Sequence, residues 1–323
     1  MEPMQYERMI LSLVDLWVRM RHPKQVWREV LRCRRLPTIA DPRTANEKFL
    51  WRKAFDHDPR IAMTCDKLAT KDFVAERCPD LNIAKVLWKG TDPRAIPDEV
   101  LSGDVVVKAS HGCRYNYFVH GGRYDRADLE RQARKWMRRT YGRQHGEWGY
   151  SQVRRQLFVE EMITEPSGGM VQKEVKLLMF GGECRLAVLI EDRYSHGEAA
   201  VFDGQFNRLD TSSGVGLPVS HSELPPSIVE MRHAARLLSR DFDHMRCDFY
   251  DRDGSVWFGE MTAYNLGGQM VYLGCDPASE CARTWDIRRS WFLTSPQKGW
   301  RRRYAEALKR RLDDRHGLPG ISE

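Results

Sequence analysis

The sequence predicts a mixed α+β protein, with helical segments at both ends of the chain and strands and hairpins between them. Apolar residues between Met9 and Met20 recur at helical spacing, and β-branched runs such as Val105–Val107 are typical of strands. The 323 residues, 41% of them hydrophobic, are enough for a substantial core and for two or three packed lobes. We therefore expect α+β lobes in the middle of the chain, a helical N-terminal region and a basic C-terminal helix.

The charge balance favours anionic partners. Charged residues make up 30% of the chain, and the formal net charge is +7. Such a balance suits nucleotides, polyanionic glycans, nucleic acid or acidic membrane surfaces, and it does not choose among them.

The cysteines and the N-terminus favour a cytoplasmic protein. Eight cysteines are scattered along the chain, no pair has Cys-x-x-Cys spacing, and no Cys/His cluster suggests zinc. We therefore expect free thiols in a reducing cytosol. The N-terminal apolar stretch is interrupted by Asp15, Arg19 and Arg21, so we expect neither a signal peptide nor a membrane span.

Helices are expected in the first 76 residues. Pro23 divides residues 4–35 into two helices, and a third helix should end near residues 56–59. Asp66 can cap a further helix over residues 67–76. Lys67 and Lys71 lie one turn apart on that helix, and solvent exposure is the default expectation for both.

A strand that ends in a lysine is the first candidate phosphate site. Residues 105–107 are three valines that lead directly into Lys108, which could reach phosphate as a point charge. The following Ser110, His111 and Gly112 could let backbone amides approach a phosphate. A second strand, residues 115–120, would close a hairpin over this site.

The chain continues with a very basic helix and more strands. Residues 126–143 should be helical, and nucleic-acid binding is disfavoured there because no recognised motif accompanies the arginines. Strands are expected at residues 156–163, 171–180 and 185–190, followed by a polar loop over 191–221 that contains Arg193 and His196. A helix over 227–240 comes next. The region from residue 285 onward should end in a basic helix, either solvated or contacting anionic glycan or membrane.

A hairpin over residues 245–262 is the candidate metal site. Asp253-Gly254 is a strong turn signal between two strands that are rich in aromatic and β-branched residues. Folding at this turn brings Asp248 and Glu260 towards each other, and paired carboxylates with phosphate oxygens suit Mg²⁺. The hairpin alone is equally compatible with two solvated surface charges.

Five groups of residues, in order along the chain, resemble the ATP-grasp superfamily. They look most like its TupA-like branch, which is named for a teichuronopeptide biosynthesis protein, from about residue 37 to residue 274. The groups are Pro37-Thr38 through Asp66-Lys67; Lys108 with His111, Gly112 and Asn116; Glu160-Glu161; Lys176 with Gly181-Gly182; and Arg246, Asp248 and residues 258–262. Five such groups in the right order are hard to obtain by chance.

The resemblance implies the ATP-grasp fold, in which two α+β lobes sandwich ATP. The implied divisions are an N-terminal helical region (1–64), a central lobe (65–160), a C-terminal lobe with the metal hairpin (161–276) and a basic helical tail (277–323). The implied nucleotide-binding residues are Lys67, Lys108, His111, Gly112, Asn116, Glu160, Glu161, Met162 and Glu174. Asp248, Glu260 and Thr262 would hold Mg²⁺, and Lys176 and Arg246 would be catalytic.

The resemblance also implies a reaction. A substrate carboxylate, from a sugar acid or an amino acid, would attack the γ-phosphate of ATP, and an amine would then attack the acyl phosphate to give an amide. The branch name suggests a place in cell-envelope polysaccharide or peptide-like product assembly. A kinase that stops at phosphoryl transfer and a non-catalytic protein that binds polyanions are the alternatives, and no specific nucleic-acid partner is expected.

Two positions depart from the family pattern. Many superfamily members have asparagine two residues after the second metal acid, where this chain has Thr262, so either Thr262 or Asn265 would complete the metal site. Relatives of the branch tend to have serine and glycine where this chain has Cys113 and Arg114. Arg114 adds charge and bulk at a place where glycine would be permissive.

Overall fold

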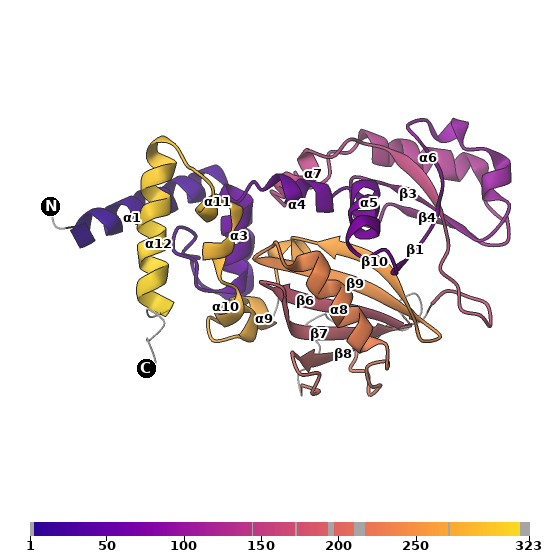
Figure 1. The fold of residues 1–323 in the computed structure, drawn as a ribbon. Helices are drawn as coiled ribbons and strands as arrows, with labels where there is room; N and C mark the ends of the chain where they lie inside the picture. Colours follow the sequence, from indigo (N-terminus) through magenta and orange to yellow (C-terminus); the bar gives the residue numbers. More distant parts are fainter. Residues whose placement is uncertain are drawn as a thin grey trace.

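The computed structural model describes residues 3–143, 145–171, 173–192, 197–209, 217–270 and 272–316, and these residues form two β-sheets with helices around them (Figure 1). One sheet has four strands in the order β2-β5-β3-β4, and the other has six in the order β1-β10-β9-β6-β7-β8. The expected mixed α+β class is confirmed. The expected domain boundaries remain predictions.

Helices form the N-terminal part of the chain. Pro23 occupies the first turn of α2, where its missing N–H costs nothing, and Thr44 and Glu47 form a capping box at the start of α3. Asp66 caps α5, as expected, by accepting from the backbone N–H of Leu68. The helices are α1 (Pro3–Arg21), α2 (Pro23–Cys33), α3 (Ala45–Phe55), α4 (Pro59–Thr64) and α5 (Lys67–Arg77).

The four-stranded sheet carries the lysine strand. Its apolar strand residues pack under α6 through Leu129, Ala133 and Trp136, which recur at helical spacing. The strands are β2 (Val86–Gly90), β3 (Val105–Ala109), β4 (Asn116–Val119) and β5 (Leu157–Glu161), all paired antiparallel. The other elements of this part are η1 (Pro93–Ala95), η2 (Asp98–Leu101), α6 (Arg126–Arg138) and α7 (Trp148–Ser151).

The six-stranded sheet carries the acidic hairpin. Asp253 and Gly254 turn the chain between β9 and β10 with φ angles of 47° and 82°, so the predicted Asp-Gly hairpin is confirmed. One face of the sheet is buried against α8. The elements are β1 (Asn82–Ile83), β6 (Lys173–Phe180), β7 (Glu183–Glu191), β8 (Glu198–Asp203), α8 (Ile228–Ser239), β9 (His244–Arg252) and β10 (Ser255–Thr262).

The C-terminal segments return to the N-terminal helices, and α1 and α12 lie side by side at the end opposite the sheets (Figure 1). The stripe of Tyr304, Ala307, Leu308 and Leu312 is buried, whereas Arg302, Arg303 and Lys309 are exposed. The elements are η3 (Asn265–Gly268), α9 (Tyr272–Cys275), α10 (Glu280–Thr284), η4 (Ile287–Arg289), α11 (Trp291–Thr294) and α12 (Gly299–His316). Among the described helices, none has the length and apolarity needed to cross a bilayer.

Two expectations about this architecture are wrong. The segment 191–221 is not simply a polar loop, because Ala199–Phe202 are buried in β8, which pairs antiparallel with β7. The apolar run of residues 199–202 is short and lies between polar residues, so its pattern did not predict a strand. Arg193 and His196 lie outside the described residues. The cysteines are also not all free thiols: Cys33 and Cys275 form a disulfide that joins α2 to α9 across 242 residues, a pairing that spacing in the sequence cannot reveal.

Candidate active site

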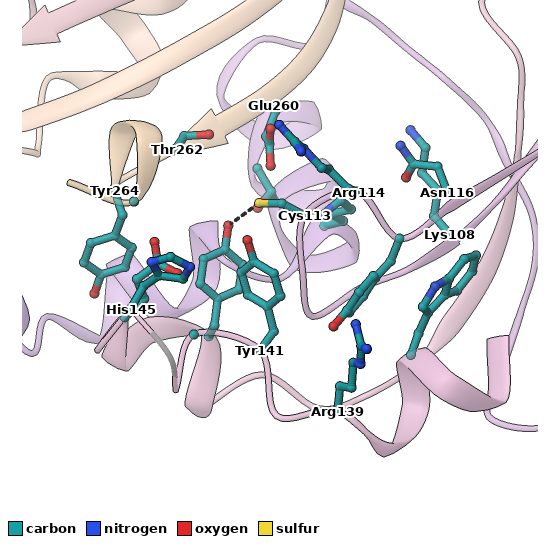
Figure 2. A pocket seen from close by; sticks show the side chains of 18 of the residues that line it. Lys108, Cys113, Arg114, Asn116, Arg139, Tyr141, His145, Glu260, Thr262 and Tyr264 are labelled. Carbon is teal, nitrogen blue, oxygen red and sulfur yellow. Dashed lines mark hydrogen bonds between the residues drawn. The ribbon is translucent and has the colours of Figure 1, made fainter. Parts of the chain in front are cut away.

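A large cleft between the two sheets gathers most of the predicted site residues. Its volume is about 2820 Å³, compared with roughly 300–1,000 Å³ for common ligand pockets. Figure 2 shows Glu260 and Thr262 from β10 facing Lys108 and Asn116, which come from β3 and β4. The predicted residues that line it are Lys67, Lys108, Asn116, Glu160, Glu174, Arg246, Glu260 and Thr262.

Lys108 shares a buried carboxylate with a second lysine. Val106 on β3 lies opposite Glu160 on β5, and Lys108, two residues further on, projects from the same face of the sheet. Lys108 forms an ion pair with Glu160, and the Nζ of Lys71 lies 2.8 Å from its other oxygen. Burial raises the pKa of Glu160, but Lys108 and Lys71 outweigh it and hold this pKa below its usual value. This wall of the cleft therefore carries two ammonium groups, those of Lys108 and Lys71, and one carboxylate, that of Glu160.

The loop after β3 is fixed by packing. The Nζ of Lys67 donates to the carbonyl of Gly112, and its backbone N–H donates to Ser110 over 3.1 Å. A Cβ at Gly112 would lie 2.7 Å from the Tyr115 ring, so only glycine fits without movement. Arg114 has a φ of 61°, in the left-handed region that favours glycine, and its side chain lines the cleft. The backbone at Arg114, which departs from the family pattern, is therefore strained where it lines the cleft.

Six predicted residues do not line the cleft: Lys176 and Asp248, which are buried in the six-stranded sheet, and His111, Gly112, Glu161 and Met162. Buried His111 has its Nε2 3.1 Å from the carbonyl of Trp136, and burial lowers its pKa, which keeps the ring neutral. Glu161 accepts from the backbone N–H of Lys85 over 2.8 Å, and the Met162 side chain is buried. These residues and Gly112 lie in the loop after β3 and at the end of β5, behind the residues that line the cleft. Their role in nucleotide binding remains a prediction.

Three adjacent strands place Lys176, Asp248 and Glu260 in one row. Lys176 on β6 lies opposite Asp248 on β9, and Asp248 lies opposite Glu260 on β10. Directly opposed residues share a face of the sheet, so the three side chains project to the same side. A bulge at Gly259 interrupts β10 just before Glu260. The row depends on this bulge, because regular pairing from the turn would place Glu260 opposite Cys247, and the hairpin sequence predicts neither the bulge nor the pairing with β6.

Asp248 is enclosed by two cations. Its carboxylate is 1% exposed and accepts from the Nε and Nη2 of Arg246, each over 2.7 Å, and from the Nζ of Lys176 over 2.7 Å. Lys176 also donates to Glu174 over 2.5 Å. Burial raises the pKa of Asp248, but Arg246 and Lys176 reverse the effect and hold it below its usual value. Asp248 is therefore ionised at neutral pH despite its burial.

Several side-chain oxygen atoms surround Arg246 next to Asp248. Its Nη1 donates to Asn265 over 2.7 Å and its Nη2 to Thr262 over 3.2 Å, while the Glu260 carboxylate lies 3.8 Å away. Glu260 is the more accessible acid, with 33% of its side chain exposed and facing the cleft. Thr262 and Asn265 thus each place a side-chain oxygen near the acids.

This donor set fits a magnesium ion that is shared with phosphate. Mg²⁺ prefers oxygen ligands and is commonly held by one or two carboxylates, with substrate phosphates and water completing its shell. Asp248 and Glu260 supply two carboxylates, and no third acid joins them closely enough to form an all-protein cage within the described residues. The one His/Cys/Asp/Glu group of three found among those residues is Glu29, Cys33 and Cys275, of which the two cysteines form the disulfide.

Lys71 and Glu147 are among the cleft-lining residues that sequence reasoning missed. Lys71 was assigned to solvent, yet it bonds Glu160 and the carbonyl of Ala84; its place on one helix face with Lys67 was the available signal. Glu147 had no signal, because its burial depends on segments far away in the sequence. Burial raises the pKa of Glu147 to about 7, and Lys53 opposes that shift only in part.

Replacing Glu147 with glutamine is expected to stabilise the protein above about pH 7. The folded-state pKa is raised from 4.5 to about 7, so the wild-type loses stability as pH rises through that window and the unfolded state releases the proton first. The variant should therefore gain roughly 3 kcal/mol in the free energy of unfolding at alkaline pH, and little near pH 4.5. Urea titrations of both proteins at several pH values measure this difference in the free energy of unfolding. Exposed Glu76→Gln is the matched control, and a pH-independent difference would contradict the assignment.

Lysines from β3 and α5 that face an acidic row on the six-stranded sheet, across a cleft, are the arrangement of an ATP-grasp protein. A model of the TupA-like ATP-grasp family matches residues 47–273, and the chain belongs to this family. The family resemblance predicted from sequence is confirmed. A search of curated proteins finds no match.

Several solved structures are similar to this chain at low identity. D-alanine–D-alanine ligase from Bacillus anthracis is 14% identical, with a TM-score of 0.41 over 80% of this chain and 71% of the other. The ATP-grasp ligase PsnB complexed with minimal precursor is 14% identical, with a TM-score of 0.39 over 76% and 69%. Phosphoribosylamine–glycine ligase from Thermotoga maritima is 10% identical, with a TM-score of 0.38 over 62% and 48%. These values say nothing about the substrates of this chain.

Proposed function

We propose that the protein is an ATP- and Mg²⁺-dependent carboxylate–amine ligase. The observation that carries the proposal is the row of Lys176, Asp248 and Glu260, which reaches the cleft of Lys108 through Glu260 and the adjacent Arg246. Phosphoryl transfer needs positioned cations more than a nucleophilic side chain, and this row concentrates them around an ionised carboxylate.

Each side chain has a place in that reaction. Lys108 and Lys67 attract the phosphates of ATP, and Glu160 holds Lys108 in position until they arrive. Asp248 and Glu260 would hold Mg²⁺, which neutralises the charge that develops on the transferred phosphoryl group. Arg246 and Lys176 face that group from the protein side and stabilise negative charge without moving.

The chemistry proceeds in two steps that balance. A carboxylate oxygen of the first substrate attacks the γ-phosphorus and ADP departs, leaving an acyl phosphate. The amine nitrogen of the second substrate then attacks the acyl carbon, phosphate leaves, and the nitrogen loses a proton to give the amide. A sugar acid or an amino acid is the proposed carboxylate, in cytoplasmic assembly of a cell-envelope polysaccharide or peptide-like product.

Product analysis tests the proposal. Purified protein is incubated with ATP, Mg²⁺ and a panel of sugar acids and amino acids, with and without amines, and ADP release is followed together with product mass. A ligase gives a product with the mass of acid plus amine minus water. A phosphorylated product without amine consumption identifies a kinase instead. Absence of ADP release, with polyanion binding that is unchanged by Lys108 or Asp248 substitution, identifies a non-catalytic binding protein.

A further inference from the structure

Two rows of basic residues from separate helices line the cleft beyond the proposed nucleotide residues. Lys24, Arg28 and Arg32 on α2 are spaced four residues apart, so they share one face of that helix. The second row comes from α6 and the segment after it, and Figure 2 shows one of its members, Arg139, reaching into the cavity. The members of the second row are Arg131, Arg134, Lys135, Arg138, Arg139 and Arg143.

Most of these cations have no acidic partner. Arg131 pairs with Asp128 and Arg134 with Glu130, as solvated helix charges commonly do. The side chains of six others form no hydrogen bond or ion pair with any residue that the structure describes: Lys24, Arg32, Lys135, Arg138, Arg139 and Arg143. Of the acids that line the cleft, Glu160 and Glu174 are paired with lysines, Asp128 with Arg131, and Glu260 lies 3.8 Å from Arg246.

The placement of these cations distinguishes them from a solvated surface. A cleft lined by charge of one sign focuses the field and concentrates counter-ions far more than a convex helix face does. The cleft is also several times larger than a pocket for one small ligand, which leaves room for a second, extended ligand beside the nucleotide. Both features point to a ligand with several negative charges.

The reaction chemistry favours polyanions that carry carboxylates over nucleic acid. This step of the inference rests on the proposed function. A ligase that activates a carboxylate must receive one beside Arg246 and Glu260, at the end of the same cleft. Bases of single-stranded nucleic acid need exposed aromatic faces for stacking. Of the aromatic residues that line the cleft, Trp136 and Tyr115 are buried and stacked on each other, with ring centroids 5.7 Å apart. Phe118, Tyr141 and Tyr250 are half-buried, so none of the five presents a fully exposed face.

We propose that the basic rows of α2 and α6 bind a polycarboxylate chain and that one of its carboxylates is the group activated in the reaction. Arginine suits this task because its planar fork can bind a carboxylate through two parallel hydrogen bonds. The shared chemistry is a repeating carboxylate, which an acidic peptide or an acidic glycan could supply.

The test compares two triple variants that remove the same charge. Arg32→Gln, Lys135→Gln and Arg138→Gln change the cleft, whereas Arg302→Gln, Arg303→Gln and Lys309→Gln change the exposed face of α12 and serve as the control. Fluorescence anisotropy measures binding of labelled oligoglutamate, oligogalacturonate and a DNA oligonucleotide at two salt concentrations. The two acidic oligomers separate a peptide source from a glycan source.

The cleft triple is expected to weaken binding of at least one polycarboxylate by about tenfold or more and to flatten its salt dependence, since fewer counter-ions are released. The control triple should change the same affinity by less than about twofold, as exposed charges commonly do. Equal losses in both triples, tighter binding of DNA than of either oligomer, or no polycarboxylate binding by the wild type would each overturn the proposal.

Two further measurements keep this inference separate from the proposed function. Binding of a fluorescent ATP analogue to the cleft triple shows where the residues act: lost nucleotide affinity would assign them to the nucleotide site and overturn the inference. Oligomer binding needs no turnover, so it can be measured on Asp248→Asn as well. Polycarboxylate binding without any ADP release would contradict the ligase, and ADP release without polycarboxylate binding would contradict only this inference.

Discussion

Replacing Asp248 with asparagine is expected to reduce ATP turnover by at least about a hundredfold, the scale seen when one preorganised charge-stabilising group is lost. The substitution keeps the shape of the side chain but removes the charge that Arg246 and Lys176 surround at 2.7 Å. It also removes one of the two carboxylates proposed to hold Mg²⁺. Steady-state ADP release with a working acid and amine is the measurement.

The turn of the same hairpin offers a matched control. Asp253 has a φ of 47°, a conformation that asparagine also tolerates, so Asp253→Asn makes the same chemical change away from the cleft. Its turnover should equal that of the wild type. Circular dichroism and a urea titration verify that both variants are folded. Wild-type turnover in folded Asp248→Asn would show that the metal assignment is wrong.

The parts of this fold that sequence could predict are those fixed by neighbours in the chain. The Asp253-Gly254 turn, the cap at Asp66 and the breaks at proline follow from local backbone chemistry. The face of β10 that carries Glu260 is an exception, because plain alternation from the turn would pair Glu260 with Cys247, and only the bulge at Gly259 brings it opposite Asp248. The family resemblance then supplied the roles of residues that are far apart in the chain.

The parts that sequence could not predict depend on contacts between distant segments. Lys71 reads as a solvated helix lysine until β5 brings Glu160 to within 2.8 Å of it. The pairing of β6 with β9, which adds Lys176 to the acidic row, is not encoded in either strand alone. The Cys33–Cys275 disulfide likewise joins residues that only the tertiary fold brings together. Each of these unpredicted features is a contact between residues far apart in the chain: an ion pair, a strand pairing and a disulfide.

Replacing Lys176 with methionine is expected to separate the structural and catalytic roles of this lysine. Lys176 is the cation shared by Glu174 and Asp248, both of which are at least 95% buried. Methionine fills similar space but leaves two buried carboxylates with less positive charge, so the free energy of unfolding should fall by roughly 3–5 kcal/mol. ATP turnover should fall by about a hundredfold or more, because a cation facing the transferred phosphoryl group is lost.

A second substitution distinguishes the two effects. In the double variant Lys176→Met, Glu174→Gln, one of the two buried charges is neutralised, so most of the lost stability should return in urea titrations. Turnover should stay low, because neutralising Glu174 does not restore the missing cation. Lys173→Met, at the start of the same strand, is the matched control and should change neither quantity appreciably. Turnover that recovers together with stability would mean that Lys176 only balances buried charge, and the transferred phosphoryl group would then depend on Arg246 and Mg²⁺ alone.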